Sequence, residues 1–266
     1  LLNCGRTVAV PKIKDGVAHG VRPIVVGHSL TRLIGSMALR HLSPDLQSFF
    51  LPLQYAISAP SGSETILHLS SALLDANPSF ALIAADAANA FNSFSRHAIW
   101  GPLRQHFPSL FRLVHFLYGS PSMQLVPDNF GKISSIPSSS GSRQGCSLGS
   151  FLYCLVSHDL IARTQSRFPS TTILAFADDL SIIGPAPDAV QAFSFFSSLY
   201  ERELYGSIRL DKCSCFSPSS PSPSLRAAGL PASIPICPSG ILLLGSPIGS
   251  DDFILSHARK TISSII

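Results

Sequence analysis

The sequence predicts an α+β fold with a central antiparallel sheet. A short apolar run ends at Asp86, two more apolar runs flank the pair Asp178–Asp179, and segments with helical periodicity lie between them. Runs of four to eight apolar residues bounded by turn residues are typical of buried strands. Strands that are interrupted by amphipathic helices favour a mixed fold over an all-β fold.

Composition sets the limits of this prediction. The chain has 266 residues and a formal net charge of +4, with 45% apolar and 13% charged residues. Such a chain is no disordered charged tail, and it can bury a large core in one domain or two. Mean hydropathy is +0.32, but polar residues interrupt every apolar stretch before the ~20 residues of a spanning helix, so no membrane partner is expected. The mild positive charge is compatible with a polyanionic partner.

The cysteines and the first residues give little functional signal. Cys213 and Cys215 form a CxC pair without a second pair at zinc-like spacing, so scattered reduced thiols are favoured over a metal site or a disulfide framework. The chain opens with "LLNCGRTVAV", with neither an initiator Met nor a signal peptide, which is expected of a fragment.

The first third of the chain is predicted to hold two helices among loops, followed by a strand. One helix begins with Ser29 as its N-cap and carries an apolar face. The second begins near Ser61, which has capping-box spacing to Glu64, and it ends at the Asn-Pro-Ser of residues 77–79. Phe80–Ala85 is then a buried strand that delivers Asp86 at its end.

The remaining segments alternate between helices, short strands and loops. Helices are expected over residues 95–107, 110–119, 148–163 and 188–205, strands over 172–176 and 180–183, a hairpin over 240–249, and loops over 133–142 and 214–224. The two strands are joined at Ala177–Asp179, so the carboxylates lie at the tip of a tight turn.

Three carboxylates therefore end neighbouring elements. If the strand of Asp86 lies beside the Asp178–Asp179 hairpin, the carboxylates converge at one edge of the sheet and repel one another unless a cation lies between them. Oxygen ligands suit Mg²⁺, and two ions about 3.5–4 Å apart can assist an in-line displacement at phosphorus. An isolated Asp-Asp pair is more often only a solvated turn. The surrounding sequence therefore decides whether this pair is read as a metal site.

Those surroundings form an ordered series of motifs. In chain order they are "RPIVVGHSLTRLIGSMALRHL", "LQYAISAPSGSETILH", "ADAANAFNSFSR", "GSRQGCSLGSFLY", "AFADDLSIIG", "LDKCSCF" and "LLLGSPIG". Together they resemble the motifs of reverse transcriptases of non-LTR (LINE-type) retrotransposons. Each match is weak alone, but seven in the family's order are specific.

The resemblance implies a right-hand polymerase fold with a truncated thumb. Residues 1–78 would be fingers, 79–100 the palm strand of the first catalytic aspartate, 101–140 an insertion between fingers and palm, 141–250 the rest of the palm, and 251–266 the start of the thumb. The implied activity is that of an RNA-directed DNA polymerase, which adds dNTPs to a primer 3′-OH along an RNA template. The implied cofactor is a pair of Mg²⁺ ions, which Mn²⁺ could replace, and a nuclear or cytoplasmic location is expected.

The resemblance also implies roles for individual residues. Asp86 and Asp178 would bridge the metals, with Asp179 as an auxiliary carboxylate and the Ala87 carbonyl as a further oxygen ligand. The remaining roles fall to Arg22, Gln144 and Gly145 at the nucleotide, Phe91 as the steric gate against a 2′-OH, Arg143 at a phosphate, Lys212 as proton donor to pyrophosphate, and Leu244 and Gly245 in the primer grip.

Alternatives remain open on the sequence. From the residues alone, Phe91 is better explained by core packing, and Lys212 is equally well explained as a solvated lysine. The whole chain could be a non-catalytic nucleic-acid scaffold, a decayed transposon copy, or a polymerase of the group II intron maturase or telomerase-like type. The presence of all three aspartates favours chemistry over a scaffold.

Overall fold

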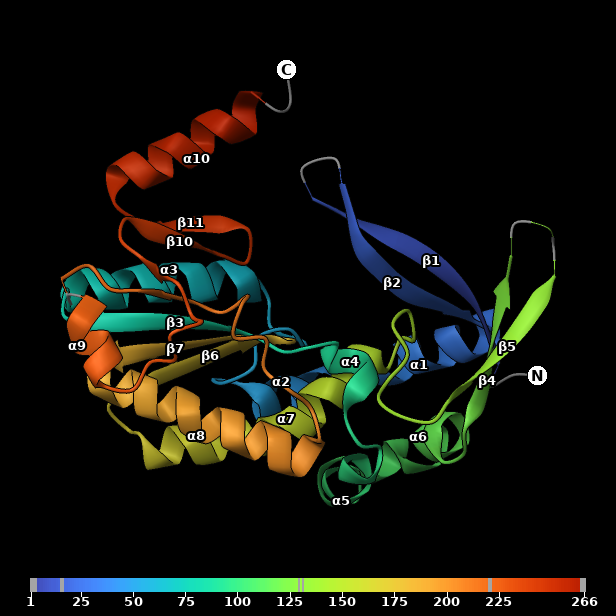
Figure 1. Ribbon diagram of the computed structural model, residues 1–266. Helices are drawn as coiled ribbons and strands as arrows, with labels where there is room; N and C mark the ends of the chain where they lie inside the picture. The colour runs from blue at the N-terminus through green and yellow to red at the C-terminus, as the bar shows by residue number, and fades with distance from the viewer. Residues whose placement is uncertain (1–3, 15–16, 129, 131, 220–221, 264–266) are drawn as a thin grey trace. The chain divides into compact units, whose positions relative to one another are not determined.

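The computed structural model divides the chain into two compact units. Unit 1 comprises Leu1–Ser48 and Asn89–Val156, and unit 2 comprises Phe49–Ala88 and Ser157–Ile266. Figure 1 labels the elements of both units along the chain. The structure describes residues 4–14, 17–128, 130, 132–219 and 222–263.

Unit 1 is built around a four-stranded sheet with the order β2-β1-β4-β5. Its strands are β1 (Gly5–Lys14), β2 (Val17–Gly27), β4 (Ser122–Pro127) and β5 (Ile133–Ser138). The two hairpins are antiparallel, and β1 and β4 join them in parallel.

The prediction of a loop was wrong for residues 133–138. Residues 133–138 pair with β4 along their whole length although they are rich in serine and proline. The strand lies at the edge of the sheet, where proline is tolerated, and its side chains are largely exposed. A strand without a buried face lacks the apolar alternation that would reveal it in the sequence.

Helices form the rest of unit 1. They are α1 (Ser29–His41), α4 (Ala90–Ser93), α5 (His97–His106), α6 (Phe111–Tyr118) and the first part of α7 (Gly149–Arg167), while α2 (Ser43–Phe50) crosses into unit 2. The predicted helix at Ser29 is confirmed, but its N-cap is His28, whose Nδ1 accepts from the Leu30 N–H at 3.2 Å. The apolar face of α1 is exposed in this chain.

Unit 2 contains a five-stranded sheet with the order β6-β7-β3-β8-β9. The strands are β3 (Phe80–Asp86), β6 (Thr172–Phe176), β7 (Asp179–Pro185), β8 (Ser214–Phe216) and β9 (Ile236–Cys237). All neighbours are antiparallel except β8 and β9, which confirms the predicted central sheet.

The prediction for residues 214–224 was also wrong. It was expected to be a low-complexity loop, yet its described residues include strand β8 and part of helix α9 (Ser222–Ala227). Cys215 and Phe216 are buried in the pairing with β3, and two such residues suffice for a short central strand. Residues 220 and 221 lie outside the described part of the chain.

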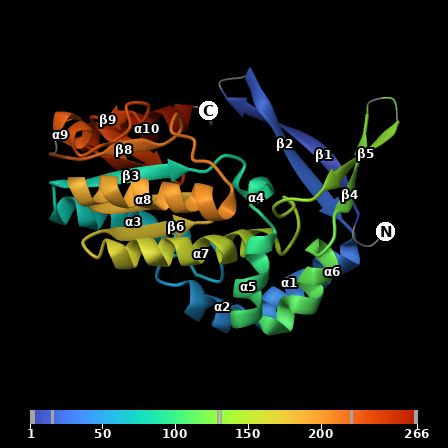
Figure 2. The same ribbon diagram turned by 60° about the horizontal axis from the view of Figure 1, so that its bottom comes forward.

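Helices cover both faces of the unit 2 sheet. Helix α3 (Gly62–Ala76) packs on β3, β6 and β7, and α8 (Ala186–Leu204) packs on β3 and β7 from the opposite face (Figures 1 and 2). The capping box expected at Ser61 is absent from α3, because Ser61 has φ 50° and its side chain makes no capping bond. Nine fully buried apolar side chains form the core on the α3 side: Ile66, Leu74, Leu82, Leu174, Ile183, Phe216, Ile241, Leu243 and Ile248.

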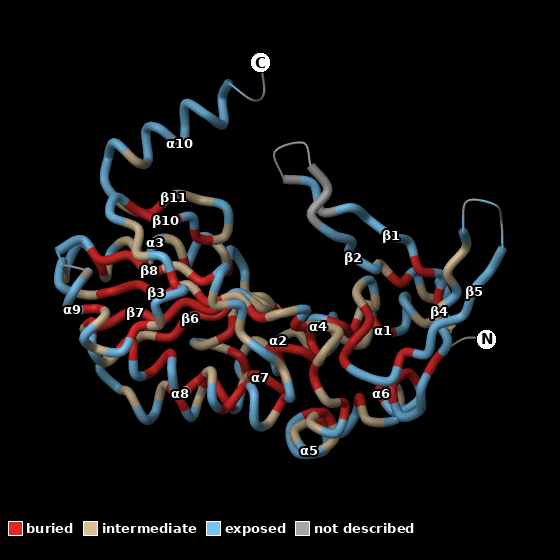
Figure 3. The backbone as a smooth tube through the Cα atoms, viewed as in Figure 1, coloured by how far each residue is buried: buried red, intermediate tan, exposed pale blue. Residues whose placement is uncertain are grey.

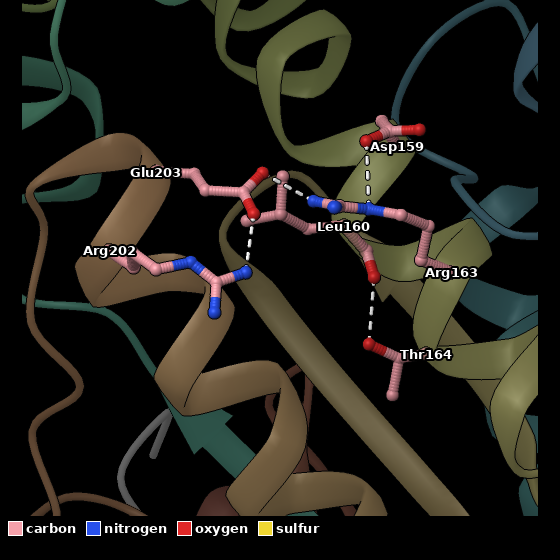
Figure 4. Close-up of polar contacts among 6 residues, drawn as sticks. All are labelled: Asp159, Leu160, Arg163, Thr164, Arg202 and Glu203. Carbon is pink, nitrogen blue, oxygen red and sulfur yellow. Dashed lines mark hydrogen bonds and ion pairs between the residues drawn. The ribbon is translucent and has the colours of Figure 1, made fainter.

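A small network of charged residues joins α7 to α8 at the surface of unit 2 (Figure 4). Arg163 pairs with Asp159 at 2.9 Å on its own helix and with Glu203 on α8. Glu203 also accepts from Arg202 at 2.8 Å. Because these side chains are largely solvated, each pair contributes at most about 1 kcal/mol, so apolar packing on the sheet dominates.

The C-terminal part of unit 2 is a hairpin followed by a helix. Strands β10 (Gly240–Leu243) and β11 (Ser246–Gly249) confirm the predicted hairpin, and α10 (Asp251–Ser263) follows it. No residue of α10 is buried, as Figure 3 shows along the whole helix. Its first turn is capped by Ser250, whose Oγ accepts from the Phe253 N–H at 3.4 Å. In the described residues, no helix has the length and apolarity to cross a membrane.

The core of unit 2 should carry most of its stability. Replacing the fully buried Leu82 by Ala should lower the free energy of unfolding by about 2–5 kcal/mol, because the substitution leaves a cavity between β3 and α3. Urea unfolding followed by circular dichroism measures this. Leu255→Ala on exposed α10 is the matched control and should change it by no more than about 0.5 kcal/mol. Equal losses for both variants would contradict the assigned core.

Candidate active site

The sheet of unit 2 brings the three aspartates together at one end. Asp86 is the last residue of β3, and it is the cross-strand partner of Asp179, the first residue of β7. Asp178 lies one residue earlier, in the two-residue turn between β6 and β7. Directly opposed residues of an antiparallel pair have Cα atoms about 4.5–5.5 Å apart. The prediction that the strand of Asp86 lies beside the Asp178–Asp179 hairpin is thus confirmed.

The turn that carries Asp178 has an unusual backbone conformation. Ala177 has φ 55°, although the first residue of such a two-residue turn would favour glycine. Left-handed conformations cost an L-residue about 1–2 kcal/mol. Strained residues of this kind cluster at functional sites, where the surrounding structure enforces them.

The carboxylates disturb one another electrostatically. Burial, together with the smaller effects of the Asp178 and Asp86 charges, raises the pKa of Asp179 to about 6, although part of the side chain reaches solvent. A carboxylic acid that resists ionisation beside two other carboxylates marks a region of strong negative potential. A cation at this position would relieve the repulsion.

The aspartates are the kind of oxygen ligand that Mg²⁺ prefers. Within the described part of the chain, no group of three or more His, Cys, Asp or Glu side chains is arranged so that it could hold a metal ion by itself. Mg²⁺ is usually held by one or two carboxylates together with substrate phosphates and water, and it does not require an all-protein cage. Asp86, Asp178 and Asp179 supply carboxylates of that kind, and Ala87 lies next in the chain.

A loop before β8 lies against Asp86. The Arg209 N–H donates to the Asp86 carbonyl at 2.8 Å, and the Arg209 guanidinium pairs with Asp211 at 2.7 and 3.0 Å. Lys212, the predicted proton donor, is exposed on the same loop. Arg209 was missed in the sequence, where its position immediately before the segment that resembles the lysine motif was the available signal.

Unit 1 contains a separate cavity of about 280 Å³. It is lined by Arg22, Ile24, Phe91, Arg143, Gln144, Gly145, Cys146, Gly149 and Ser150. Four of the five residues predicted to lie at the nucleotide, Arg22, Phe91, Gln144 and Gly145, are among them, and so is Arg143, whereas Ala87 is not. Segments more than 100 residues apart in the chain therefore meet in one cavity.

The wall formed by Gln144 and Gly145 is tied to β2. The Gln144 carbonyl accepts from the Val25 N–H at 2.7 Å, and a Cβ on Gly145 would lie 2.8 Å from the Val25 carbonyl oxygen. Gly145 also has φ 97°, so only glycine fits this close approach. Among the described residues, the buried Oε1 of Gln144 has no hydrogen-bond partner. A buried acceptor without a partner normally lowers the stability of the fold by about 1–3 kcal/mol, and a ligand that donates a hydrogen bond to it would remove this penalty.

Phe91 lies between the cavity and the core of unit 1. Its ring contacts Tyr153 with 5.1 Å between centroids, and it also lines the cavity. Its backbone carbonyl accepts from the Ser142 N–H at 2.6 Å, which connects α4 to the loop before Gln144. Packing and a steric role are therefore compatible for this residue.

Two buried arginines hold the loop around the cavity. Arg96 donates to the carbonyls of Gly141 at 2.9 Å and Ser138 at 2.8 Å. The guanidinium groups of Arg96 and Arg143 both lie against the Tyr118 ring, 5.1 and 4.9 Å from its centroid. Burial lowers the pKa of Arg96 and raises that of Tyr118. The guanidinium groups of Arg96 and Arg143 are held by neutral partners, so their positive potential remains and favours an anionic ligand.

The hairpin at the predicted primer grip has Leu244 and Gly245 at its tip. Both have positive φ, at 49° and 83°, as a type I′ hairpin turn requires. Leu244 packs against the core of unit 2, whereas a side chain at Gly245 would meet open space.

The comparisons with known proteins identify the family. The model of the family "Reverse transcriptase (RNA-dependent DNA polymerase)" matches residues 10–228. The chain belongs to the reverse transcriptase family. The resemblance seen in the sequence is therefore confirmed, and the domain is that of an RNA-directed DNA polymerase, a nucleotidyltransferase. Reverse transcriptases generally use divalent metal ions.

Individual relatives agree with this assignment. The chain is 25% identical over 177 residues to the retrotransposable element SLACS 132 kDa protein of Trypanosoma brucei gambiense, covering 62% of this chain but 14% of that protein. Telomerase from Candida albicans, solved with a TWJ fragment of telomeric RNA, has a TM-score of 0.66 at 12% identity over 95% of this chain and 46% of that one. Apo telomerase from Candida tropicalis, truncated from its C-terminal domain, gives a TM-score of 0.60 at 14% identity over 83% of this chain and 51% of that one. The structural matches confirm the right-hand polymerase fold.

The shifted pKa of Asp179 predicts a pH dependence of stability. Because the folded state holds this proton more tightly than the unfolded state, ionisation between about pH 4 and pH 6 should lower the free energy of unfolding. Asp179→Asn removes that penalty. Urea unfolding of both proteins from pH 4 to pH 8 should show the variant gaining on the wild type up to about pH 6 and levelling off above. A constant difference would contradict the raised pKa.

Proposed function

We propose that this domain copies RNA into DNA for a non-LTR (LINE-type) retrotransposon. Its reaction would be the addition of dNTPs to a primer 3′-OH. The observation that carries the proposal is the meeting of Asp86, Asp178 and Asp179 at one end of the β3–β7 sheet. The "DAANAFN" run after that strand favours the LINE type, and the similarity to a retrotransposable element supports it.

In this proposal, the two units divide the work. Unit 2 acts as the palm and carries the carboxylates, and unit 1 acts as the fingers and binds the incoming nucleotide. The cavity lined by Arg22, Gln144 and Gly145 supports this division, because a guanidinium and an unpartnered acceptor suit a triphosphate and a hydrogen-bond donor of the nucleotide. Arg143 and the buried Arg96 add positive potential to the same loop.

Asp86 and Asp178 would hold two Mg²⁺ ions, with Asp179 and the Ala87 carbonyl as further oxygen ligands. When bound, the ions would neutralise charge on the phosphates and favour ionisation of the primer hydroxyl. Mn²⁺ could replace them, since it accepts the same oxygen ligands.

The chain's own residues account for the other steps. The primer 3′-oxygen forms a bond to the α-phosphorus, the bond to the β-phosphate bridge breaks, and pyrophosphate leaves. The hydroxyl proton passes to water, and Lys212 donates a proton to the pyrophosphate. Leu244 and Gly245 hold the primer end at the tip of the β10–β11 hairpin. The RNA template and DNA primer are polyanions, which the net charge of +4 suits.

Asp178→Ala should separate chemistry from binding. Primer extension on poly(rA)/oligo(dT) with Mg²⁺ should fall by at least about 10³-fold, because a lost metal ligand removes several kcal/mol of transition-state stabilisation. Affinity for the primer–template should stay within about twofold, since it rests on many phosphate contacts. Asp75→Ala, at an exposed carboxylate of α3, is the control and should keep full activity. Parallel loss of binding and extension by Asp178→Ala would argue against a catalytic role.

Phe91→Ala tests the choice of sugar. Removing the ring from the cavity wall should admit a 2′-OH and lower the dNTP-over-rNTP ratio of kcat/KM by about 10-fold or more. Phe94→Ala is the matched control, because Phe94 also packs against Tyr153 but does not line the cavity. A ratio that is unchanged in Phe91→Ala, or that falls equally in both variants, would assign Phe91 to core packing alone.

A further inference from the structure

A buried glutamine lies beside the strand that leads to the catalytic turn. Gln54 is fully buried, and its segment forms a short parallel bridge with β6 at Ala175. The Tyr55 N–H donates to the Ala175 carbonyl at 2.8 Å, and the Ala175 N–H donates to the Leu53 carbonyl at 2.8 Å. Residues 53–55 thus cover the free edge of β6, close to where β6 ends.

The Gln54 side chain binds the backbone of the turn itself. Its Oε1 accepts from the Ala177 N–H at 2.8 Å and from the Ala56 N–H at 3.1 Å, and its Nε2 donates to the Ala177 carbonyl at 3.1 Å. Both polar backbone groups of Ala177 are therefore held by one side chain. An amide can do this because it carries a donor and an acceptor together, which neither an ionised carboxylate nor an apolar chain provides.

These bonds act on a residue that needs support. Ala177 adopts φ 55°, which is unfavourable for an L-residue, and Asp178 follows it directly. An alternative backbone conformation at Ala177 would rotate the next peptide and redirect the Asp178 carboxylate. The two bonds from Gln54 oppose that change, and the repulsion among the aspartates favours it.

We infer that Gln54 is a positioning residue of the active site, which holds the β6–β7 turn so that Asp178 faces the metal. The inference rests on the proposed function for its effect on catalysis, but its effect on metal binding can be measured without polymerisation. Outer residues that orient metal ligands commonly change metal affinity or activity by about 10–100-fold when they are replaced.

The chain offers a close internal control at the other end of the same strand. Gln165 accepts from the Ile173 N–H at 2.9 Å and donates to the Thr171 carbonyl at 2.6 Å. It thus makes the same kind of amide–backbone contacts at the start of β6, away from the aspartates. A purely structural role would make Gln54 and Gln165 equivalent.

The test compares Gln54→Met with Gln165→Met. Each variant is assayed for kcat and KM in primer extension, for Mn²⁺ affinity by electron paramagnetic resonance, and for urea unfolding. Gln54→Met should lower kcat by about 10–100-fold, with KM for dTTP within about threefold, and should weaken Mn²⁺ binding by about 10-fold. Gln165→Met should share the loss of stability, yet its kcat and Mn²⁺ affinity should stay within twofold of wild type. Equal effects of both variants on kcat and Mn²⁺ affinity would overturn the inference.

A double variant covers the case in which Gln54→Met fails to fold. Ala177→Gly removes the penalty of the left-handed conformation, so Gln54→Met with Ala177→Gly should regain stability while kcat and Mn²⁺ affinity stay low. Recovery of wild-type kcat in the double variant would show that Gln54 serves only folding. The proposed function and this inference can fail separately. If the wild-type protein shows no polymerase activity but Gln54→Met still weakens Mn²⁺ binding, the proposed function is refuted and this inference stands.

Discussion

Repulsion among three carboxylates at one end of a sheet is the constraint on which the rest of the site depends. Strand pairing sets Asp86 opposite Asp179, and a two-residue turn adds Asp178 beside them. Burial and the charges of the two neighbouring aspartates together raise the pKa of Asp179. In the proposed function, a divalent cation between the carboxylates would relieve this repulsion.

The surrounding structure resists that repulsion through backbone contacts. The loop before β8 holds the Asp86 carbonyl through the Arg209 N–H, and Gln54 holds both polar groups of Ala177. Unit 1 uses the same principle with the opposite charge, because the buried Arg96 holds the loop before Gln144 through carbonyl oxygens. In both units, hydrogen bonds between side chains and neutral backbone groups fix the loops or turns that belong to the site.

The sequence predicted those parts of the structure whose signal is local. Phe80–Asp86 and the β6–β7 hairpin were found because apolar runs ended at aspartates, and Arg22, Phe91 and Gln144, which the motifs singled out, line one cavity. Strands β5 and β8 were missed because their composition resembles that of a loop, and β8 also pairs with a strand that is remote in the sequence. Gln54 and Arg209 were missed for a related reason: their significance lies in contacts with backbone more than 100 residues away.

The most direct test of the account is to locate the cation itself. Fe²⁺ bound in place of Mg²⁺, with ascorbate, peroxide, a chain-terminated primer–template and dNTP, generates radicals that cut the nearest backbone. We expect cleavage near residue 86 and near residues 177–179, suppressed by excess Mg²⁺ and lost in Asp178→Asn. Cleavage elsewhere in the chain, or cleavage at these residues that neither Mg²⁺ nor the substitution reduces, would contradict it.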